Sequence, residues 1–451
     1  MKIIIVGCGK VGQTLAEKLS SGENDITIVD ISSEKVKTIS ERYDVMGVVG
    51  NGASHTVLKE AGIVDADLFI AVTRSDELNL LCCMVAKKEG HCQTIARVKN
   101  PEYSKESSYL QAQLGLSMVI NPEYAAAEEI ARVLRFPAAV QIEPFAKGKI
   151  ELIKFKLPQG NKLVGMTVRE MAMKLHPDVL VCTIERGEEL LVVNGDSVFE
   201  EKDLISIVAT PKNAVDFFDK IGYKGNSIKD AMIVGGGSIT HYLCDILQNS
   251  KMAIKIIEKD YSVCEELCSK LQKANVIHGN PADKELLKEE GVEKAGAFVT
   301  LTDFDEENIL LSLYAKEEGE GKLITKINRT DYDSVINRLD LDTVICPKNI
   351  TADSIVRYVR SIQNTMGSNI EAMYDVGQGQ GEISEFIVKE NSSITDTPLC
   401  QLSFKKNILI AAISRGEEVI LPRGQDVIKA GDSVIVLSKD MALWDIADVL
   451  R

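Results

Sequence analysis

The sequence predicts an α/β protein in which a doubly wound parallel sheet, followed by a small α+β lobe, occurs twice in tandem. Strands and helices alternate from Lys2 to Val98, shorter strands with two helices follow from Ile150, and the whole series recurs about 229 residues later. Regular alternation of strands and helices is typical of a parallel sheet covered by helices. In the lobe, shorter strands joined by turns at Arg186–Gly187 and Asn194–Gly195, together with two helices, are typical of an α+β fold.

The chain opens in the order strand, glycine turn, helix, strand, acid. The apolar run Ile3–Val6 leads into Gly7–Gly12, an amphipathic run follows, and a second apolar run, Ile26–Val29, ends at Asp30. This G-x-G-x-x-G pattern between a strand and a helix is typical of a Rossmann-like nucleotide-binding domain. A purely structural turn is the alternative.

Each part of this motif has a physical role. Gly7 can adopt the backbone angles of a tight turn, Gly9 leaves room for a diphosphate, and Gly12 lets the helix approach the strand closely. The free amides at the helix start face the phosphates. Asp30, 18 residues past Gly12, is placed to accept hydrogen bonds from a ribose, and its charge would repel a 2′-phosphate. NAD or ATP therefore fits better than NADP.

The rest of the first sheet follows from the same alternation. Its expected helices are Ser33–Tyr43, Thr56–Ala61 and Leu78–Lys88, and its expected strands are Val48–Val49, Leu68–Val72 and Thr94–Val98. Ligands of such sheets lie beyond the carboxyl ends of the strands. The polar or small residues at those ends are Asp30, Asn51, Gly52, Thr73, Arg74 and Arg97. Simple polar termination of strands is the alternative for each of them.

A helix over Glu123–Leu134, started by Pro122, links this sheet to the small lobe. The stripe of Ile130, Val133 and Leu134 suits a partner surface or a link between modules. Expected strands in the lobe are Glu151–Leu157, Val179–Glu185, Leu190–Val193 and Leu204–Val208, and expected helices are Thr167–Lys174 and Asn213–Ile221.

The second half repeats the first at a steady offset. Gly235 matches Gly7 and Glu258 matches Asp30 at 228 residues, and Thr302 matches Thr73 at 229. Such a constant offset indicates duplication with almost no insertions. The predicted boundaries are 1–121 and 228–346 for the nucleotide-binding domains, 122–147 and 347–376 for linking helices, and 148–222 and 377–451 for the lobes.

The two copies differ at positions important for binding. Thr240 replaces the third glycine, Pro281 stands at the position of Gly52, and Lys326 replaces Arg97. We expect the second helix to pack less closely and its turn to be distorted. The first site is therefore expected to bind more tightly than the second.

Composition excludes several classes of function. The net charge of −15 argues against nucleic acid or anionic lipid as the main partner. No apolar run approaches the ~18 residues of a membrane span, and the N-terminal run is too short for a signal peptide, so a cytoplasmic location is expected. The 10 cysteines form no C-x-x-C pair and the 5 histidines no ligand spacing, so no metal is expected. No nucleophile elbow or Walker motif is present either, which favours a sensor over a catalyst.

With these residues in view, the chain resembles the TrkA family of potassium-uptake regulatory subunits, which consist of RCK (KTN) nucleotide-binding domains with C-terminal RCK lobes. The resemblance rests on the glycine motif with Asp30, on Gly50 with Asn51, on Ala71–Thr73 with Asn79, on Ala96–Pro101, and on the tandem order over the full length. The family often has aspartate at the position of Asn51, so the charge of this corner differs here.

The resemblance implies a set of nucleotide contacts in each half. In the first half these are Gly7, Cys8, Gly9, Lys10, Val11, Gly12, Asp30, Asn51, Gly52, Thr73, Arg74 and Arg97. In the second half they are Gly235, Gly236, Gly237, Ser238, Ile239, Glu258, Gly279, Asn280, Thr302, Asp303 and Lys326.

It also implies a peripheral protein on the inner face of the membrane. Such a protein assembles as a homotetramer with a potassium-translocating membrane subunit of the Trk type and does not insert into the bilayer. NAD(H), or ATP or ADP at the same sites, would bias the assembly between two shapes that gate ion flow. An NAD-dependent oxidoreductase with an unidentified substrate, and a pure assembly module, are the alternatives.

Overall fold

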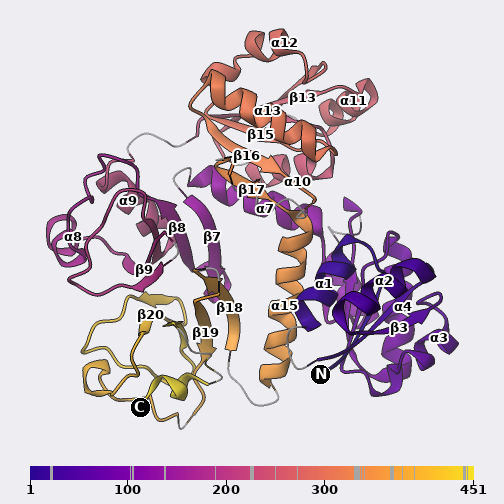
Figure 1. Ribbon diagram of the computed structural model, residues 1–451, viewed down its shortest axis with the longest axis horizontal. Coiled ribbons are helices and arrows are strands. Elements are labelled where there is room, and N and C mark those ends of the chain that lie inside the picture. Colours follow the sequence, from indigo (N-terminus) through magenta and orange to yellow (C-terminus); the bar gives the residue numbers. More distant parts are fainter. Residues whose placement is uncertain are drawn as a thin grey trace. The chain divides into compact units, whose positions relative to one another are not determined.

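The computed structural model describes residues 1–451 except 21–23, 102, 104–105, 137–138, 188, 224–227, 249, 272, 330–335, 337, 340, 366–369, 378, 391, 440–442 and 444. The chain divides into two compact units, each built from two separate segments (Figure 1). One unit contains Met1–Ala131 and Asp230–Val356, and the other contains Arg132–Lys229 and Arg357–Arg451.

The first unit contains two parallel six-stranded sheets with the same strand order. In the first half the order is β3-β2-β1-β4-β5-β6, which is the order of a dinucleotide-binding sheet. Its strands are β1 (Lys2–Val6), β2 (Asp25–Asp30), β3 (Met46–Val49), β4 (Leu68–Ala71), β5 (Gln93–Arg97) and β6 (Met118–Ile120). Its helices are α1 (Lys10–Ser20), α2 (Ser33–Tyr43), α3 (His55–Glu60), α4 (Asp76–Gly90), α6 (Ser107–Leu114) and α7 (Pro122–Arg135).

In the second half the order is β14-β13-β12-β15-β16-β17, which confirms the predicted duplication of the sheet. The strands are β12 (Asp230–Val234), β13 (Ala253–Glu258), β14 (Ala274–His278), β15 (Ala297–Thr300), β16 (Lys322–Lys326) and β17 (Thr343–Ile345). The helices are α10 (Ser238–Leu247), α11 (Tyr261–Lys270), α12 (Lys284–Glu289), α13 (Asp305–Glu318) and α15 (Pro347–Thr365).

Burial explains why these segments form these elements. Ile3–Val6 is apolar throughout and buried, as expected for a central strand covered on both faces. The helix α2 begins where the Ser32 hydroxyl accepts a hydrogen bond from the Lys35 amide, and it buries Val36 and Ile39 against the sheet. The sequence prediction lacked α6 and β6, which are short and carry little periodic signal.

The two halves of this unit contact each other through α10. The Tyr242 hydroxyl donates to the Lys99 carbonyl at 3.0 Å and accepts from the Asn121 amide at 2.9 Å. Its ring meets the Tyr124 ring edge-on, with centroids 5.5 Å apart. Elsewhere in the unit, Lys18 pairs with Asp353. Each helix that starts at a glycine turn therefore contacts the long helix of the other half, α7 or α15.

We expect Tyr242→Phe to lower the free energy of unfolding by about 1–2 kcal/mol. The change keeps the ring and removes the hydrogen bonds of a buried hydroxyl to Lys99 and Asn121, each of which contributes about 1 kcal/mol. Urea denaturation followed by circular dichroism measures the difference. Tyr261→Phe, on an exposed ring of the same half, is the control, and an equal loss in both variants would contradict the prediction.

The second unit contains the two small lobes, each with a five-stranded antiparallel sheet. The sheet of the first lobe has the order β10-β9-β11-β8-β7 and that of the second has β18-β19-β22-β20-β21. In the first lobe the elements are β7 (Ala139–Phe145), β8 (Ile150–Lys156), α8 (Val168–Leu175), β9 (Leu180–Arg186), β10 (Glu189–Val192), β11 (Leu204–Ala209) and α9 (Pro211–Lys220). In the second they are β18 (Ile370–Val376), β19 (Gly381–Ile387), β20 (Ile408–Arg415), β21 (Glu418–Ile420) and β22 (Ser433–Lys439).

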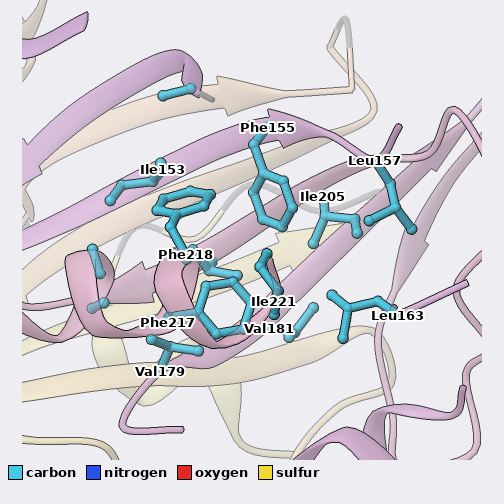
Figure 2. Packing of buried hydrophobic residues seen from close by; sticks show 14 of the residues in the cluster. Ile153, Phe155, Leu157, Leu163, Val179, Val181, Ile205, Phe217, Phe218 and Ile221 are labelled. Atoms are coloured by element: carbon cyan, nitrogen blue, oxygen red, sulfur yellow. The ribbon is translucent and has the colours of Figure 1, made fainter. Parts of the chain in front are cut away.

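Apolar side chains cover both faces of the first lobe's sheet. On one face, Phe155 from β8 packs on Phe217 and Phe218 from α9, and Figure 2 shows these rings gathered with Ile153 and Ile205. On the other face a second cluster joins the two lobes. It contains Phe145, Ile150, Leu152, Tyr374, Ile383 and Leu437.

The linking helices are shorter than predicted. The segments 122–147 and 347–376 are helical over Pro122–Arg135 and Pro347–Thr365, and each ends in a strand, β7 or β18, while 366–369 lie outside the described residues. Both are edge strands with a break in register, and β7 contains Pro144. A bulge shifts the alternation of inward-facing and outward-facing side chains, and a proline is unusual within a strand. The sequence pattern therefore did not indicate strands here.

Within the described part of the chain, none of the helices combines the length and the apolar content needed to cross a bilayer.

Candidate functional site

The first glycine turn has the geometry that its sequence predicts. Gly7 has φ +107°, and a Cβ there would lie 2.9 Å from the Thr73 amide nitrogen. A Cβ on Gly12 would lie 1.9 Å from the Gly7 carbonyl oxygen, so the helix start packs directly on the turn. A Cβ on Gly9 would meet nothing within 4 Å. The open space beside Gly9, next to the first amides of α1, fits the diphosphate of a dinucleotide.

Asp30 connects this turn to the end of β2. Its Oδ2 accepts from the Cys8 amide at 2.7 Å, and its Oδ1 accepts from the Ser32 amide at 2.9 Å. A carboxylate has about four acceptor positions, so two amides leave positions for ribose hydroxyls. The structure thus holds Asp30 beside the turn in a fixed orientation.

Asn79 organises the ends of β4 and β5. This buried side chain accepts from the Thr73 amide at 2.8 Å and donates to the carbonyls of Thr73 and Arg97 at 3.3 and 2.9 Å. The Thr73 hydroxyl donates to Asn79 Oδ1 at 2.7 Å, so in this arrangement it can accept from a ribose hydroxyl but cannot donate to a phosphate. Arg97 Nη1 also donates to the Thr73 carbonyl, at 3.2 Å.

Asp76 was not among the predicted site residues, although it shapes the same edge. Its Oδ2 accepts from the amides of Lys99 and Asn100 at 2.8 and 2.7 Å, which fixes the segment after β5. Asp305 does the same for Asn328 and Arg329 in the second half. The signal in the sequence was the match of the two aspartates at the offset of 229.

The remaining predicted residues of the first half lie in the loop after β3, against β1, at the start of α1 and after β4. Asn51 Oδ1 accepts from the Ala53 amide at 3.0 Å, so it closes the loop after β3. A Cβ on Gly52 would lie 2.2 Å from a methyl carbon of Val6, which places Gly52 against β1. Lys10 and Arg74 are exposed, while Val11 is buried and can offer a ligand only its backbone.

Cys8 lies inside the turn but is not a reactive thiol. Burial, and next the charge of Asp30, raise the pKa of Cys8 to about 12. The thiol therefore stays protonated at neutral pH and is a poor nucleophile. Among the described residues, no group of histidine, cysteine and acidic side chains could hold a metal ion.

The second half reproduces the turn in spite of Thr240. Gly235 has φ +100°, and Glu258 accepts from the amides of Gly236 and Asp260 at 2.7 and 2.8 Å. The Thr240 hydroxyl donates to the Gly235 carbonyl at 2.5 Å. The prediction that this turn is distorted is therefore wrong, because Thr240 forms a hydrogen bond with the turn and does not displace it. Asn308 bridges Thr302 and Lys326 as Asn79 does in the first half.

A cavity of about 420 Å³ lies at this second turn. Of the predicted contacts, it is lined by Gly235, Gly236, Gly237, Ser238, Glu258, Thr302 and Asp303. Lys326 is buried, with Nζ 3.6 Å from Asp303 Oδ1, and Asn280 Oδ1 closes its loop by accepting from the Ala282 amide. Ile239 is buried in α10, and Gly279 follows β14.

Other lining residues were missed by the sequence analysis. The polar, charged and aromatic residues among them are His241, Lys259, Asp260, Glu266, Phe304 and Glu307. They come from the ends of β13 and β15 and from helix faces, where no motif marks them. An alignment of the two halves shows that acids replace neutral residues at several of these positions, and this difference could have identified them from the sequence. Burial lowers the pKa of His241, so this imidazole favours its neutral form.

Comparison with known proteins agrees with this arrangement. The TrkA-N domain model matches residues 3–122 and 231–347, and the TrkA-C domain model matches 152–222 and 383–447. A Trk system potassium uptake protein TrkA homolog 1 of Methanosarcina mazei is 33% identical, with 99% of each chain covered. The Trk system potassium uptake protein TrkA of Haemophilus influenzae is 32% identical over 98% of this chain and 96% of its own.

Solved structures share the fold at low sequence identity. The GsuK channel bound to NAD has a TM-score of 0.64 at 16% identity, covering 97% of this chain and 77% of its own. The GsuK RCK domain has a TM-score of 0.63 at 16% identity, covering 97% of this chain and 92% of its own. Because the domain models match most of the chain and the relatives align over nearly their whole length, this chain belongs to the TrkA family.

Proposed function

We propose that this chain is the nucleotide-binding regulatory subunit of a potassium uptake system. The observation that carries the proposal is the repeated glycine turn, with open space at Gly9 and at Gly237 and a carboxylate held beside each turn. The relatives named as potassium uptake proteins extend over the same full length. NAD(H) is the proposed ligand, with ATP or ADP as alternatives at the same sites.

The proposed contacts are those implied by the family resemblance. In this arrangement the amides after Gly7 hold the diphosphate, Asp30 holds the ribose, and Lys10, Arg74 and Arg97 supply positive charge. The matched positions of the second half, from Gly235 to Lys326, form a second candidate nucleoside site. The partner is a membrane subunit of the Trk type that conducts potassium, and the chain acts from the cytoplasmic side as a homotetramer.

Regulation in such an assembly follows from differential affinity. A nucleotide shifts a two-state assembly only by the difference between its affinities for the two states. A tenfold preference is about 1.4 kcal/mol per site, so several sites acting together produce a decisive bias. The helices α7 and α15 are the proposed path for this motion, because each contacts the other half of its unit.

We expect deletion of the gene to lower the rate of rubidium uptake by the cells, and the wild-type gene to restore it. A gene carrying Gly9→Val should not restore the rate, because its product folds but has a blocked diphosphate position. Uptake that is unchanged in the deleted cells would contradict the proposed function.

An NAD-dependent oxidoreductase is the competing function. Incubation of the purified chain with NAD⁺ or NADH and a panel of metabolites separates the two. We expect the absorbance of the nicotinamide band to change only on binding and then to stay constant with time. Steady turnover with any metabolite would favour the enzyme.

A further inference from the structure

The two glycine turns have opposite electrostatic surroundings. The second cavity is lined by five acids, Glu258, Asp260, Glu266, Asp303 and Glu307, and by one lysine, Lys259, for a formal charge of −4. The matched positions of the first half contain one acid, Asp30, and three bases, Lys10, Lys35 and Arg74, for a formal charge of +2. The glycine turn is therefore surrounded by net positive charge in the first half and by net negative charge in the second half.

Lys326, the base at the position of Arg97, is already engaged. Lys326 Nζ lies 3.6 Å from Asp303 Oδ1 and donates to the Leu301 carbonyl at 3.5 Å, and its side chain is almost buried. Of the other acids, Glu266 pairs with Lys270 at 2.6 Å. Within the described part of the chain, Glu258, Asp260 and Glu307 form no salt bridge, so a diphosphate in this cavity would meet three carboxylates without a basic partner. Repulsion between like charges disfavours such a complex.

The neutral parts of a nucleoside still have partners in the second cavity. Glu258 accepts from two amides, at the positions matching those that donate to Asp30, and its carboxylate keeps acceptor positions for ribose hydroxyls. Phe304, at the position of Ser75, exposes 58% of its surface and lines the cavity, with Lys259 Nζ 5.4 Å from its ring centroid. An exposed aromatic ring beside a sugar site can stack on a base.

We propose that the second cavity binds a nucleoside that carries little or no phosphate charge, and that it rejects NADH and ATP. This inference rests on the proposed nucleotide-binding function and assigns different ligand classes to its two sites. The first half then responds to the dinucleotide, and the second half responds to a dephosphorylated product of nucleotide metabolism such as adenosine.

Two variants isolate the sites for the test. Gly9→Val blocks the first turn and Gly237→Val blocks the second, and at both positions a Cβ meets no protein atom within 4 Å. Each protein is titrated calorimetrically with adenosine, AMP, ADP, ATP and NADH, with EDTA present so that no metal ion shields the phosphates. In Gly9→Val we expect adenosine to bind tightest and ATP at least about 100-fold more weakly. In Gly237→Val we expect NADH and ATP to bind more tightly than adenosine.

A charge variant tests the cause of the preference. In the Gly9→Val protein, Asp303→Arg with Glu307→Leu installs the residues of the first half at positions 74 and 78. We expect it to tighten ADP binding by at least tenfold (about 1.4 kcal/mol) and to reduce or reverse the preference for adenosine over ADP. Asp245→Asn, on α10 and not lining the cavity, is the control and should change neither affinity.

The outcomes separate this inference from the proposed function. ATP or NADH binding to Gly9→Val as tightly as adenosine would overturn the inference alone, and so would binding of NADH to Gly237→Val with no adenosine binding to Gly9→Val. Failure of both proteins to bind any of the five compounds would overturn the nucleotide-binding function and the inference together.

Discussion

In a protein whose second site is blocked by Gly237→Val, the further change Gly9→Val is expected to weaken NADH binding by at least about 100-fold. The valine side chain would occupy the open space beside the start of α1. A diphosphate displaced from there loses at least two charge-assisted hydrogen bonds to backbone amides, each worth about 1.5–3 kcal/mol. Fluorescence titration of NADH against the single and double variants measures the loss.

Gly12→Val is the matched control for this prediction. Its Cβ would lie 1.9 Å from the Gly7 carbonyl oxygen, so the change disrupts the packing of α1 on the turn. We expect Gly12→Val to lower the urea midpoint of unfolding clearly, while Gly9→Val changes stability by at most about 1 kcal/mol. Retention of NADH affinity by the folded double variant would show that this turn does not bind the diphosphate.

In the first lobe, Arg186→Met is expected to lower the free energy of unfolding by about 3–5 kcal/mol. Arg186 Nε and Nη2 donate to Asp203 Oδ1 and Oδ2, each at 2.8 Å, and Asp203 is 1% exposed. These hydrogen bonds also raise the pKa of Arg186. Without the guanidinium, the carboxylate stays buried with only the Glu200 amide as a described donor, at 2.7 Å. Urea denaturation followed by circular dichroism measures the change.

Arg169→Met in the same lobe is the control. Arg169 pairs with Asp196 at 3.1 Å, but the two side chains are 60% and 84% exposed. An exposed pair of this kind contributes at most about 1 kcal/mol. If both variants lose the same free energy of unfolding, the burial of Asp203 does not determine how much its ion pair with Arg186 contributes to stability. The second lobe repeats the buried pair as Arg415 with Asp432, so Arg415→Met should behave like Arg186→Met.

Most elements of the two sheets could be predicted because their signals are local. The helix Ser33–Tyr43 has the predicted bounds, and the strands around Gly7 and Gly235 follow from short apolar runs next to glycine. Elements without a local signal were missed. Met118–Ile120 is too short to show periodicity, and Ala139–Phe145 has a break in register and a proline.

The candidate site was predictable to the same extent. The glycine turn and Asp30 lie in one continuous motif, so their spacing was enough to place them together. Asp76, Phe304 and Glu307 are ordinary helix-start residues in the sequence. They gain a role only because the ends of parallel strands bring them to one edge of a sheet.

The sequence by itself determined the fold class, the duplication and the positions of both glycine turns, because each depends on backbone preferences and on the spacing of nearby residues. Only the tertiary structure decided how the four modules combine. Both sheets share one compact unit and both lobes share the other, so each unit joins segments that are separated by about 100 residues or more of chain. It also decided that Thr240 is accommodated and that Tyr242 reaches Lys99. Contacts between distant segments depend on which surfaces meet, and no local pattern encodes that choice.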